Sequence, residues 1–422
     1  MNHGSDFNAT PQGSDLTETA PLPTTIPMLD WTETGQSHRA RWRSENRLPP
    51  PKRVLVADDS MTADAAYKLA CEGTAVLWRG DFQNARQLLQ AMARRIDRKS
   101  DKPARTVSPA PRAATPTFPQ AFHLYRQAKA QRARTMGMLL LPLGFNYGIA
   151  LPRAPDVRQA CTEAWGPDAD TQAGAESCAG IVSLREVLGL IGGHEWRKKG
   201  IEIPATGGRI HPHYGVFAPV RNEYVKLVVE APWPAALASS PSPCKRAFDI
   251  GTGTGVLAAV LARRGVARII AADRDPRAVA CARDNLEQLG LAAHVEVMQA
   301  ELFPEGRAEL VLCNPPWVPA SAGSPLDHAV YDPDSRMLRA FLGGLAAHLE
   351  PGGEGWLVLS DLAEHLALRS RDELLAAIDK AGLIVVGRTE VRPQHPRASD
   401  RTDALHAARE AEVTSLWRLA AR

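Results

Sequence analysis

The sequence predicts an α/β fold: a doubly wound parallel sheet in the last part of the chain, preceded by a smaller, mainly helical N-terminal region. From residue 246 onward, short β-rich runs alternate with helical runs. This alternation is typical of a parallel sheet with helices on both faces. The chain has 422 residues, which is longer than one typical domain, so two or three folding units are expected.

Seven strands and four helices are expected in this last part. The strands are predicted near residues 246–250, 267–273, 294–299, 308–313, 354–360, 383–390 and 412–419. The helices are predicted near residues 254–264, 276–289, 335–349 and 369–381.

Composition and periodicity divide the remainder of the chain. Residues 1–50 are rich in Ser, Thr, Pro and Asp without apolar periodicity, so they are predicted to be a disordered tail. Apolar residues at helical spacing predict a helical unit over 51–98. A stretch rich in Pro, Ala, Ser and Arg predicts a linker over 99–119. Residues 120–214 are interpreted as an accessory or substrate-recognition region, and 215–422 as the last domain.

The net charge of +3 is too small to indicate a nucleic-acid partner by itself, but its distribution is uneven. Between Arg86 and Arg134 there are twelve Lys or Arg residues and two acidic residues. Two interpretations stay open: a solvated helix face followed by a charged linker, or an RNA-binding surface.

Metal and membrane chemistry are not expected. The six cysteines form no CxxC pair, and His211-Pro212-His213 lacks a third ligand, so no metal site is predicted. No apolar run is long enough to span a membrane, and the first residues do not resemble a secretory signal. We therefore expect a cytoplasmic location and no membrane partner.

A glycine-rich turn follows the first strand of the last domain. Residues 247–250 lead into Gly251, Gly253 and Gly255, which lets the backbone approach a ligand and presents a helix N-terminus to it. A dinucleotide site would need glycine where Val256 stands. The carboxylate of Asp249 favours a cationic ligand over a pyrophosphate. The turn therefore predicts a cofactor that carries an ammonium or sulfonium group.

Acidic residues follow the next two strands. Asp273 comes about 20 positions after the glycines, at the carboxyl end of a strand, where it can accept hydrogen bonds from both ribose hydroxyls. Asp275-Pro276 is predicted to start the following helix as N-cap and first residue. Glu301, after the third strand, is placed to meet an adenine amino group.

The fourth strand ends in Asn314-Pro315-Pro316-Trp317, the most specific motif in the chain. A planar amide or amino nitrogen is a poor nucleophile, so an enzyme must bind its hydrogens and fix its plane. The side-chain oxygen of Asn314 and the carbonyl of Pro315 can accept those hydrogens, and Trp317 can stack on the planar group. The motif predicts an acceptor site for such a nitrogen.

At these residues the chain resembles the S-adenosylmethionine-dependent class I methyltransferases with an NPP[YFW] motif, which share the methyltransferase small domain. This family includes release-factor glutamine N5-methyltransferases and enzymes that methylate exocyclic amines of nucleic-acid bases. The resemblance covers about residues 215–422 and implies a seven-stranded Rossmann-like sheet whose final strand inserts antiparallel.

The resemblance also implies roles for individual residues. It places S-adenosylmethionine as the cofactor, with its methionine end near Asp249 and the three glycines. It places the ribose at Asp273, the adenine near Glu301, and the target nitrogen at the catalytic residues Asn314, Pro315 and Trp317, with Asn314 also bordering the cofactor. Two departures limit the transfer: residues 219–224 differ from the stretch that glutamine methyltransferases show there, and residues 51–215 match no substrate domain that we can name.

The expected function is N-methylation of a planar nitrogen, in a protein glutamine or an RNA base of the translation machinery. The alternative acceptor is adenine N6 or guanine N2 of a nucleic acid. The non-enzymatic alternative is a catalytically silent module that only binds the cofactor. A dehydrogenase is disfavoured by Val256 and Asp249.

Overall fold

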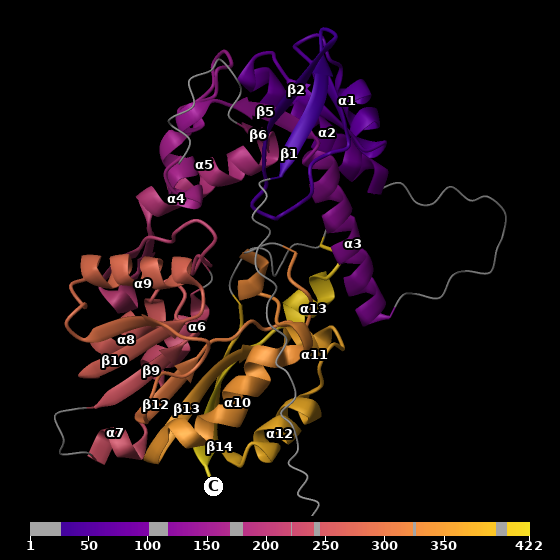
Figure 1. Cartoon of the computed structure of the whole chain (residues 1–422). Coiled ribbons are helices and arrows are strands. Elements are labelled where there is room, and N and C mark those ends of the chain that lie inside the picture. Colours follow the sequence, from indigo (N-terminus) through magenta and orange to yellow (C-terminus); the bar gives the residue numbers. More distant parts are fainter. Residues whose placement is uncertain are drawn as a thin grey trace, which may run out of the picture.

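The computed structural model describes residues 27–100, 117–168, 180–220, 222–239, 245–323, 326–393 and 403–422. Figure 1 shows two α/β units, with the N-terminal unit above the C-terminal one. Among these residues, no helix is both long and apolar enough to cross a membrane.

The C-terminal unit is built on one seven-stranded sheet. Its strands are β9 (Arg246–Ile250), β10 (Arg268–Asp273), β11 (Val295–Gln299), β12 (Ala308–Cys313), β13 (Leu349–Ser360), β14 (Leu383–Val391) and β15 (Thr414–Ala421). Their spatial order is β11-β10-β9-β12-β13-β15-β14. All neighbours pair in parallel except β15, which is antiparallel to both β13 and β14. The predicted α/β fold is confirmed.

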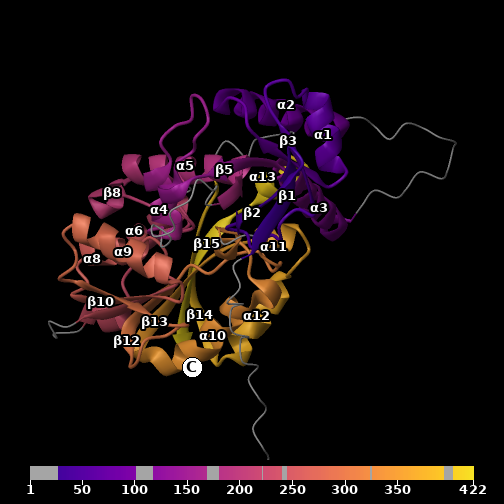
Figure 2. The ribbon, with the colours of Figure 1, turned by 45° about the horizontal axis from the view of Figure 1, so that its top comes forward.

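Helices cover both faces of this sheet. They are α8 (Val256–Arg263), α9 (Pro276–Gln288), α10 (Arg336–His348), α11 (Leu362–His365), α12 (Arg371–Lys380) and α13 (His406–Ala411). Alternate residues of β9 separate the two apolar cores: Ala247 packs with α8, and Phe248 and Ile250 pack with α10. This alternation follows from the two-residue period of a strand. Figure 2 shows the sheet running between these helices.

The N-terminal region is not built from helices alone, as the sequence predicted, because its helices pack on a six-stranded mixed sheet of order β1-β2-β6-β5-β4-β3 that was not predicted. Its elements are β1 (Met28–Glu33), β2 (Gln36–Arg43), β3 (Arg53–Ala57), α1 (Ala63–Cys71), β4 (Thr74–Trp78), α2 (Phe82–Ser100), α3 (Phe118–Met136), β5 (Leu139–Leu143), α4 (Arg158–Trp165), β6 (Gly180–Ser183) and α5 (Leu184–Lys199). The strands β3 and β4 are five residues long, and each has four apolar residues in a row after its first residue. Periodicity alone does not distinguish such a run from a buried helix segment.

The predicted disordered tail over residues 1–50 is also wrong for residues 28–43, which form the hairpin β1–β2. Thr34 and Gly35 form its two-residue turn, and both have positive φ, as tight hairpin turns require. Trp31 and Trp42 are buried on the sheet. The hairpin was not predicted because its short alternation of buried and exposed residues lies within a stretch rich in Ser, Thr and Pro. Residues 1–26, and 101–116 of the predicted linker, lie outside the described residues.

A connecting segment joins the two units. It contains the short strands β7 (Ile201–Ile203) and β8 (Gly208–Ile210), then α6 (Glu223–Glu230) and α7 (Ala235–Ser239). The buried side chain of Asn285 on α9 anchors this segment, because its oxygen accepts a 2.7 Å hydrogen bond from the backbone N–H of His211. Its amide nitrogen donates to the carbonyl of Thr254 in the glycine-rich turn. The segment is therefore tied directly to the predicted cofactor turn.

Candidate active site

The carboxyl ends of three neighbouring strands bring three predicted site residues into one row. Ile250 on β9 pairs with Ala272 on β10 and with Cys313 on β12. The next residues along these parallel strands are Gly251, Asp273 and Asn314. Because neighbouring strands lie about 4.8 Å apart, these three residues stand side by side at the edge of the sheet. This edge lies at a reversal of strand order, the place where open α/β sheets bind ligands.

The three glycines of the turn each have positive φ: +72° at Gly251, +57° at Gly253 and +80° at Gly255. A side chain at Gly253 would meet nothing within 4 Å, so open space adjoins the turn there. At Gly251, by contrast, an added Cβ would lie 2.8 Å from the side chain of Met337. The turn therefore packs against α10 at Gly251 and has free space beside it at Gly253.

Asp249 lies beneath this turn and is 1% exposed. One of its carboxylate oxygens accepts hydrogen bonds from the Thr252 hydroxyl, at 2.7 Å, and from the Ala258 backbone N–H, at 3.0 Å. Burial raises the pKa of this carboxyl to about 6. These bonds hold the turn and the first turn of α8 together. A direct contact between Asp249 and a ligand stays a prediction.

Asp273 braces the same turn from the neighbouring strand. Its Oδ2 accepts a 3.0 Å hydrogen bond from the Gly253 N–H, and its Oδ1 accepts one of 2.9 Å from the Asp275 N–H. Burial raises the pKa of the Asp273 carboxyl, while these two bonds oppose the shift. A carboxylate offers about four lone-pair sites, so acceptor capacity remains for two ligand hydroxyls. Asp275 caps α9 as expected, accepting from the Arg277 N–H.

Glu301 follows β11 at the far side of the row. Its side chain is 81% exposed and its Oε1 lies 3.9 Å from a guanidinium nitrogen of Arg274. No described contact fixes it toward the turn, so its role beside an adenine stays a prediction.

The Asn314–Trp317 motif forms a compact turn after β12. The indole N–H of Trp317 donates a 2.9 Å hydrogen bond to Asn314 Oδ1. A carbonyl oxygen has two lone pairs, so Asn314 Oδ1 keeps one for another donor. Trp317 is half-buried, and its ring packs on the apolar residues around Val318. Stacking of this ring on an acceptor stays a prediction, since the structure shows its edge engaged with Asn314.

The other candidates have ordinary partners. His213 Nε2 lies 2.9 Å from Asp284 Oδ2, and His211 Nδ1 lies 2.6 Å from the carbonyl of Arg197. Within the described ranges, no three His, Cys, Asp or Glu side chains are grouped so as to hold a metal. Burial raises the pKa of the Cys313 thiol well above its usual value, so it would be a poor nucleophile at neutral pH.

Sequence reasoning missed a contact between the N-terminal unit and the edge of the site. Glu45, which follows β2, forms an ion pair with Arg277 in the first turn of α9. The second oxygen of Glu45 accepts a 3.2 Å hydrogen bond from the Trp165 indole. Glu45 lies in the stretch interpreted as a tail, and no local pattern in the sequence indicates a partner more than 200 positions away.

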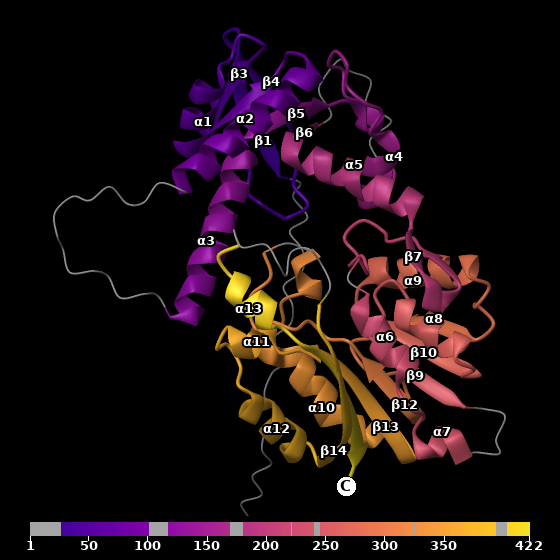
Figure 3. The ribbon, with the colours of Figure 1, turned by 180° about the vertical axis from the view of Figure 1, so that it is seen from behind.

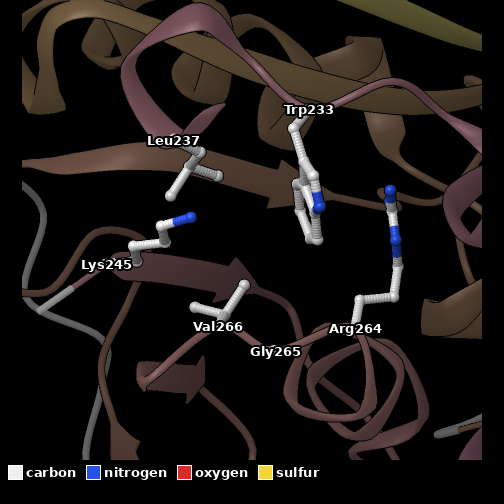
Figure 4. Close-up of a pocket in the computed structure, with 6 residues that line it drawn as sticks. All are labelled: Trp233, Leu237, Lys245, Arg264, Gly265 and Val266. Atoms are coloured by element: carbon white, nitrogen blue, oxygen red, sulfur yellow. The ribbon is translucent and has the colours of Figure 1, made fainter. Parts of the chain in front are cut away.

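A small pocket elsewhere in the C-terminal unit is distinct from the candidate active site. It lies between α7 and the start of β9, and its lining residues are Trp233, Leu237, Lys245, Arg264, Gly265 and Val266. Figure 4 shows these side chains around it. Lys245 precedes β9 and Gly265 follows α8, so the pocket lies at the amino edge of the sheet, opposite the glycine-rich turn.

The doubly wound sheet and the glycine-rich turn at its carboxyl edge define a Rossmann-like cofactor-binding domain. Residues 235–370 match the family model described as methyltransferase small domain. The predicted resemblance to methyltransferases is thereby confirmed for this part of the chain.

Two curated relatives are similar to the chain. It is 36% identical over 145 residues to the ribosomal protein L11 methyltransferase of Pelotomaculum thermopropionicum, which covers 34% of this chain and 39% of the relative. It is 38% identical over 134 residues to the release factor glutamine methyltransferase of Cereibacter sphaeroides, and this match covers 28% of this chain and 47% of the relative. The chain spans less than half the length of these relatives.

A solved structure, the ribosomal protein L11 methylase of Lactobacillus delbrueckii subsp. bulgaricus, is similar with a TM-score of 0.32 and 13% identity. That similarity covers 49% of this chain and 82% of the other.

Proposed function

We propose that this protein is an S-adenosylmethionine-dependent N-methyltransferase that acts on a planar amide or amino nitrogen in a component of the translation machinery. The observation that carries the proposal is the position of Asn314, beside Gly251 at the carboxyl edge, with one lone pair of its side-chain oxygen bonded to Trp317 and one left for an acceptor. A methyl donor at the turn and a nitrogen at Asn314 would then lie next to each other.

The residues at the turn fit this cofactor. Asp273 keeps acceptor capacity for two ribose hydroxyls, and the open space beside Gly253 would take the part of the cofactor that crosses the turn. The N-terminus of α8 and the buried Asp249 carboxylate add opposite electrostatic contributions, which suits a cofactor with both a carboxylate and cationic groups. When bound, S-adenosylmethionine supplies a methyl group that is already activated by its sulfonium.

The chain's own residues then have a positioning task. Asn314 Oδ1 and the Pro315 carbonyl accept hydrogens of the acceptor nitrogen, which fixes its plane and turns its lone pair toward the turn. The Trp317 N–H holds Asn314 Oδ1 from one side, so that its other lone pair has a defined direction. Orientation of this kind accounts for a large share of the rate in group transfer between two bound partners.

The names of the curated relatives support an acceptor in the translation machinery: one acts on ribosomal protein L11 and the other on a release factor glutamine. We propose a protein glutamine or an RNA base as acceptor, and a cytoplasmic location follows from either. The N-terminal unit, which meets the edge of the site through Glu45, is proposed to select the acceptor.

One observation favours a nucleic acid as the second candidate acceptor, methylated at adenine N6 or guanine N2. Helix α3 carries Arg126, Lys129, Arg132 and Arg134 and has no acidic residue. Some basic residues of the region 86–134 are already paired, Arg95 with Asp64 and Arg132 with Asp97. Lys129 and Arg134, which are exposed on α3, would be available to phosphates.

The test is to incubate the full chain with radiolabelled S-adenosylmethionine and an extract of the source organism, then to digest with nuclease or protease. We expect labelled macromolecules, and the digestion that releases the label identifies the acceptor class. Tight cofactor binding by calorimetry without any labelling, in extracts of several growth states, would instead support the catalytically silent module.

A further inference from the structure

Helix α3 connects the two units of the protein. Near its end, Met136 packs into the apolar core of the N-terminal unit. Near its start, Phe122 is 3% exposed and packs with Val318, Leu362 and Leu366 of the C-terminal unit. At about 1.5 Å per residue, the helix carries these two contacts about 21 Å apart. Figure 3 shows α3 running from the N-terminal unit to the side of α13.

Arg126 lies one helical turn after Phe122 and contacts both arms of the loop that follows Trp317. Its guanidinium carbon lies 4.3 Å from the centre of the Tyr331 ring. One of its nitrogens donates a hydrogen bond to the carbonyl of Ser321. Ser321 lies on the outgoing arm of this loop and Tyr331 on the returning arm.

The two arms are also bonded to each other at Val318. The Val318 N–H donates to the Val330 carbonyl at 3.1 Å, and the Asp332 N–H donates to the Val318 carbonyl at 2.9 Å. Val318 directly follows Trp317, whose indole holds Asn314. On the outgoing arm, Ser321 is therefore four residues after Trp317, the last residue of the proposed acceptor motif. On the returning arm, Tyr331 lies between Val330 and Asp332, which are both hydrogen-bonded to Val318.

We propose that Arg126 is a positioning residue for the acceptor site: it clamps the two arms, residues 317–323 and 326–332, so that Trp317 and Asn314 keep the orientation that methyl transfer needs. This inference rests on the proposed function. An arginine suits the position because its planar guanidinium can stack on a tyrosine ring and still donate in its own plane to a carbonyl. A lysine would keep the charge but would not do both with the same geometry.

The test compares Arg126→Ala and Arg126→Lys with wild type in the full chain, using the labelled acceptor fraction. Arg158→Ala is the matched control, because Arg158 is an exposed arginine of the same unit whose described partner is Asp156. We expect Arg126→Ala to lower kcat at least tenfold at unchanged S-adenosylmethionine affinity and melting temperature, with Arg126→Lys in between and Arg158→Ala like wild type. Unchanged kcat in Arg126→Ala, or a loss that follows melting temperature, would overturn the proposal.

A second measurement does not depend on activity. Amide hydrogen exchange of the peptides that cover residues 317–332, without cofactor or acceptor, should be at least tenfold faster in Arg126→Ala than in wild type and Arg158→Ala. If the wild-type protein transfers no methyl group, the proposed function fails while this measurement still decides whether the clamp exists. Equal exchange in all three proteins would refute the clamp.

Discussion

The indole N–H of Trp317 donates a hydrogen bond to the side-chain oxygen of Asn314, three residues earlier in the chain. This bond links two residues that the motif assigns separate tasks, binding the acceptor hydrogens and stacking on the acceptor plane. It means that the orientation of the amide depends on the position of the ring. A change at Trp317 should therefore act on catalysis through Asn314 even if the ring never contacts the acceptor.

Replacing Trp317 with Phe tests this coupling, because an aromatic ring is kept and the indole N–H donor is removed. We expect methyl transfer to fall about tenfold, with Asn314→Ala falling about 100-fold or more, since misplacement by 1 Å can have that effect. Both variants should bind S-adenosylmethionine with near wild-type affinity, as measured by calorimetry. Loss of affinity in proportion to turnover in Asn314→Ala would assign Asn314 to the cofactor and not to the acceptor.

Replacing Gly253 with Ala should weaken S-adenosylmethionine binding at least tenfold. The added methyl group enters the open space beside the turn, and a residue with a Cβ resists the φ of +57° found there. Gly290→Ala is the control, because Gly290 has a φ of +68° with nothing within 4 Å and lies after α9, away from the turn. Both variants should lose about 1–2 kcal/mol of unfolding free energy. Equal cofactor affinity in the two variants would contradict the turn as the cofactor site.

The half-buried carboxyl of Glu186 on α5 should make stability depend on pH. Burial raises its pKa to about 7, and its Oε1 accepts a 2.6 Å hydrogen bond from the Glu45 N–H. The folded state therefore binds this proton more tightly than the unfolded state. The stability from this group is fully present below its ordinary pKa of about 4.5 and is lost as the pH rises to about 7.

Glu186→Gln removes this dependence and keeps the hydrogen-bond acceptor. In urea unfolding, the variant should gain about 1–3 kcal/mol relative to wild type between pH 5 and pH 8. The exposed Glu230→Gln serves as control and should show no such gain. A constant difference between Glu186→Gln and wild type at both pH values would show that the carboxyl titrates normally.

Local signals predicted the C-terminal fold and most of its site edge. The glycine-rich turn, the strand-end position of Asp273 and the Asn314 motif each depend on a few consecutive residues, and parallel register then aligns them at one edge. The orientation of Asp249 was harder to predict, because a strand-end carboxylate can turn toward the ligand or toward the helix N-terminus behind it. The structure shows one oxygen of Asp249 bonded to the Thr252 hydroxyl and to the N-terminus of α8, and a contact with a ligand stays a prediction.

Long-range contacts and short strands were not predicted. The N-terminal sheet contains strands of four to eight residues whose sequences resemble a polar tail or a helix, and only pairing across the sheet distinguishes them. The contacts of Glu45 with Arg277, and of Arg126 with Tyr331, join positions some 200 residues apart. Nothing in the local sequence around either residue indicates its partner.

The span of α3 between the two cores has a consequence for the order of folding. During synthesis α3 emerges about 180 residues before the loop at 317–332, so the N-terminal unit can fold first and offer Phe122 and Arg126 as a preformed surface. The loop would then close onto this surface as a late event, because contacts of such large sequence separation are slow to form. The acceptor side of the site would therefore take its final form only after the N-terminal unit has folded and the loop has docked on it.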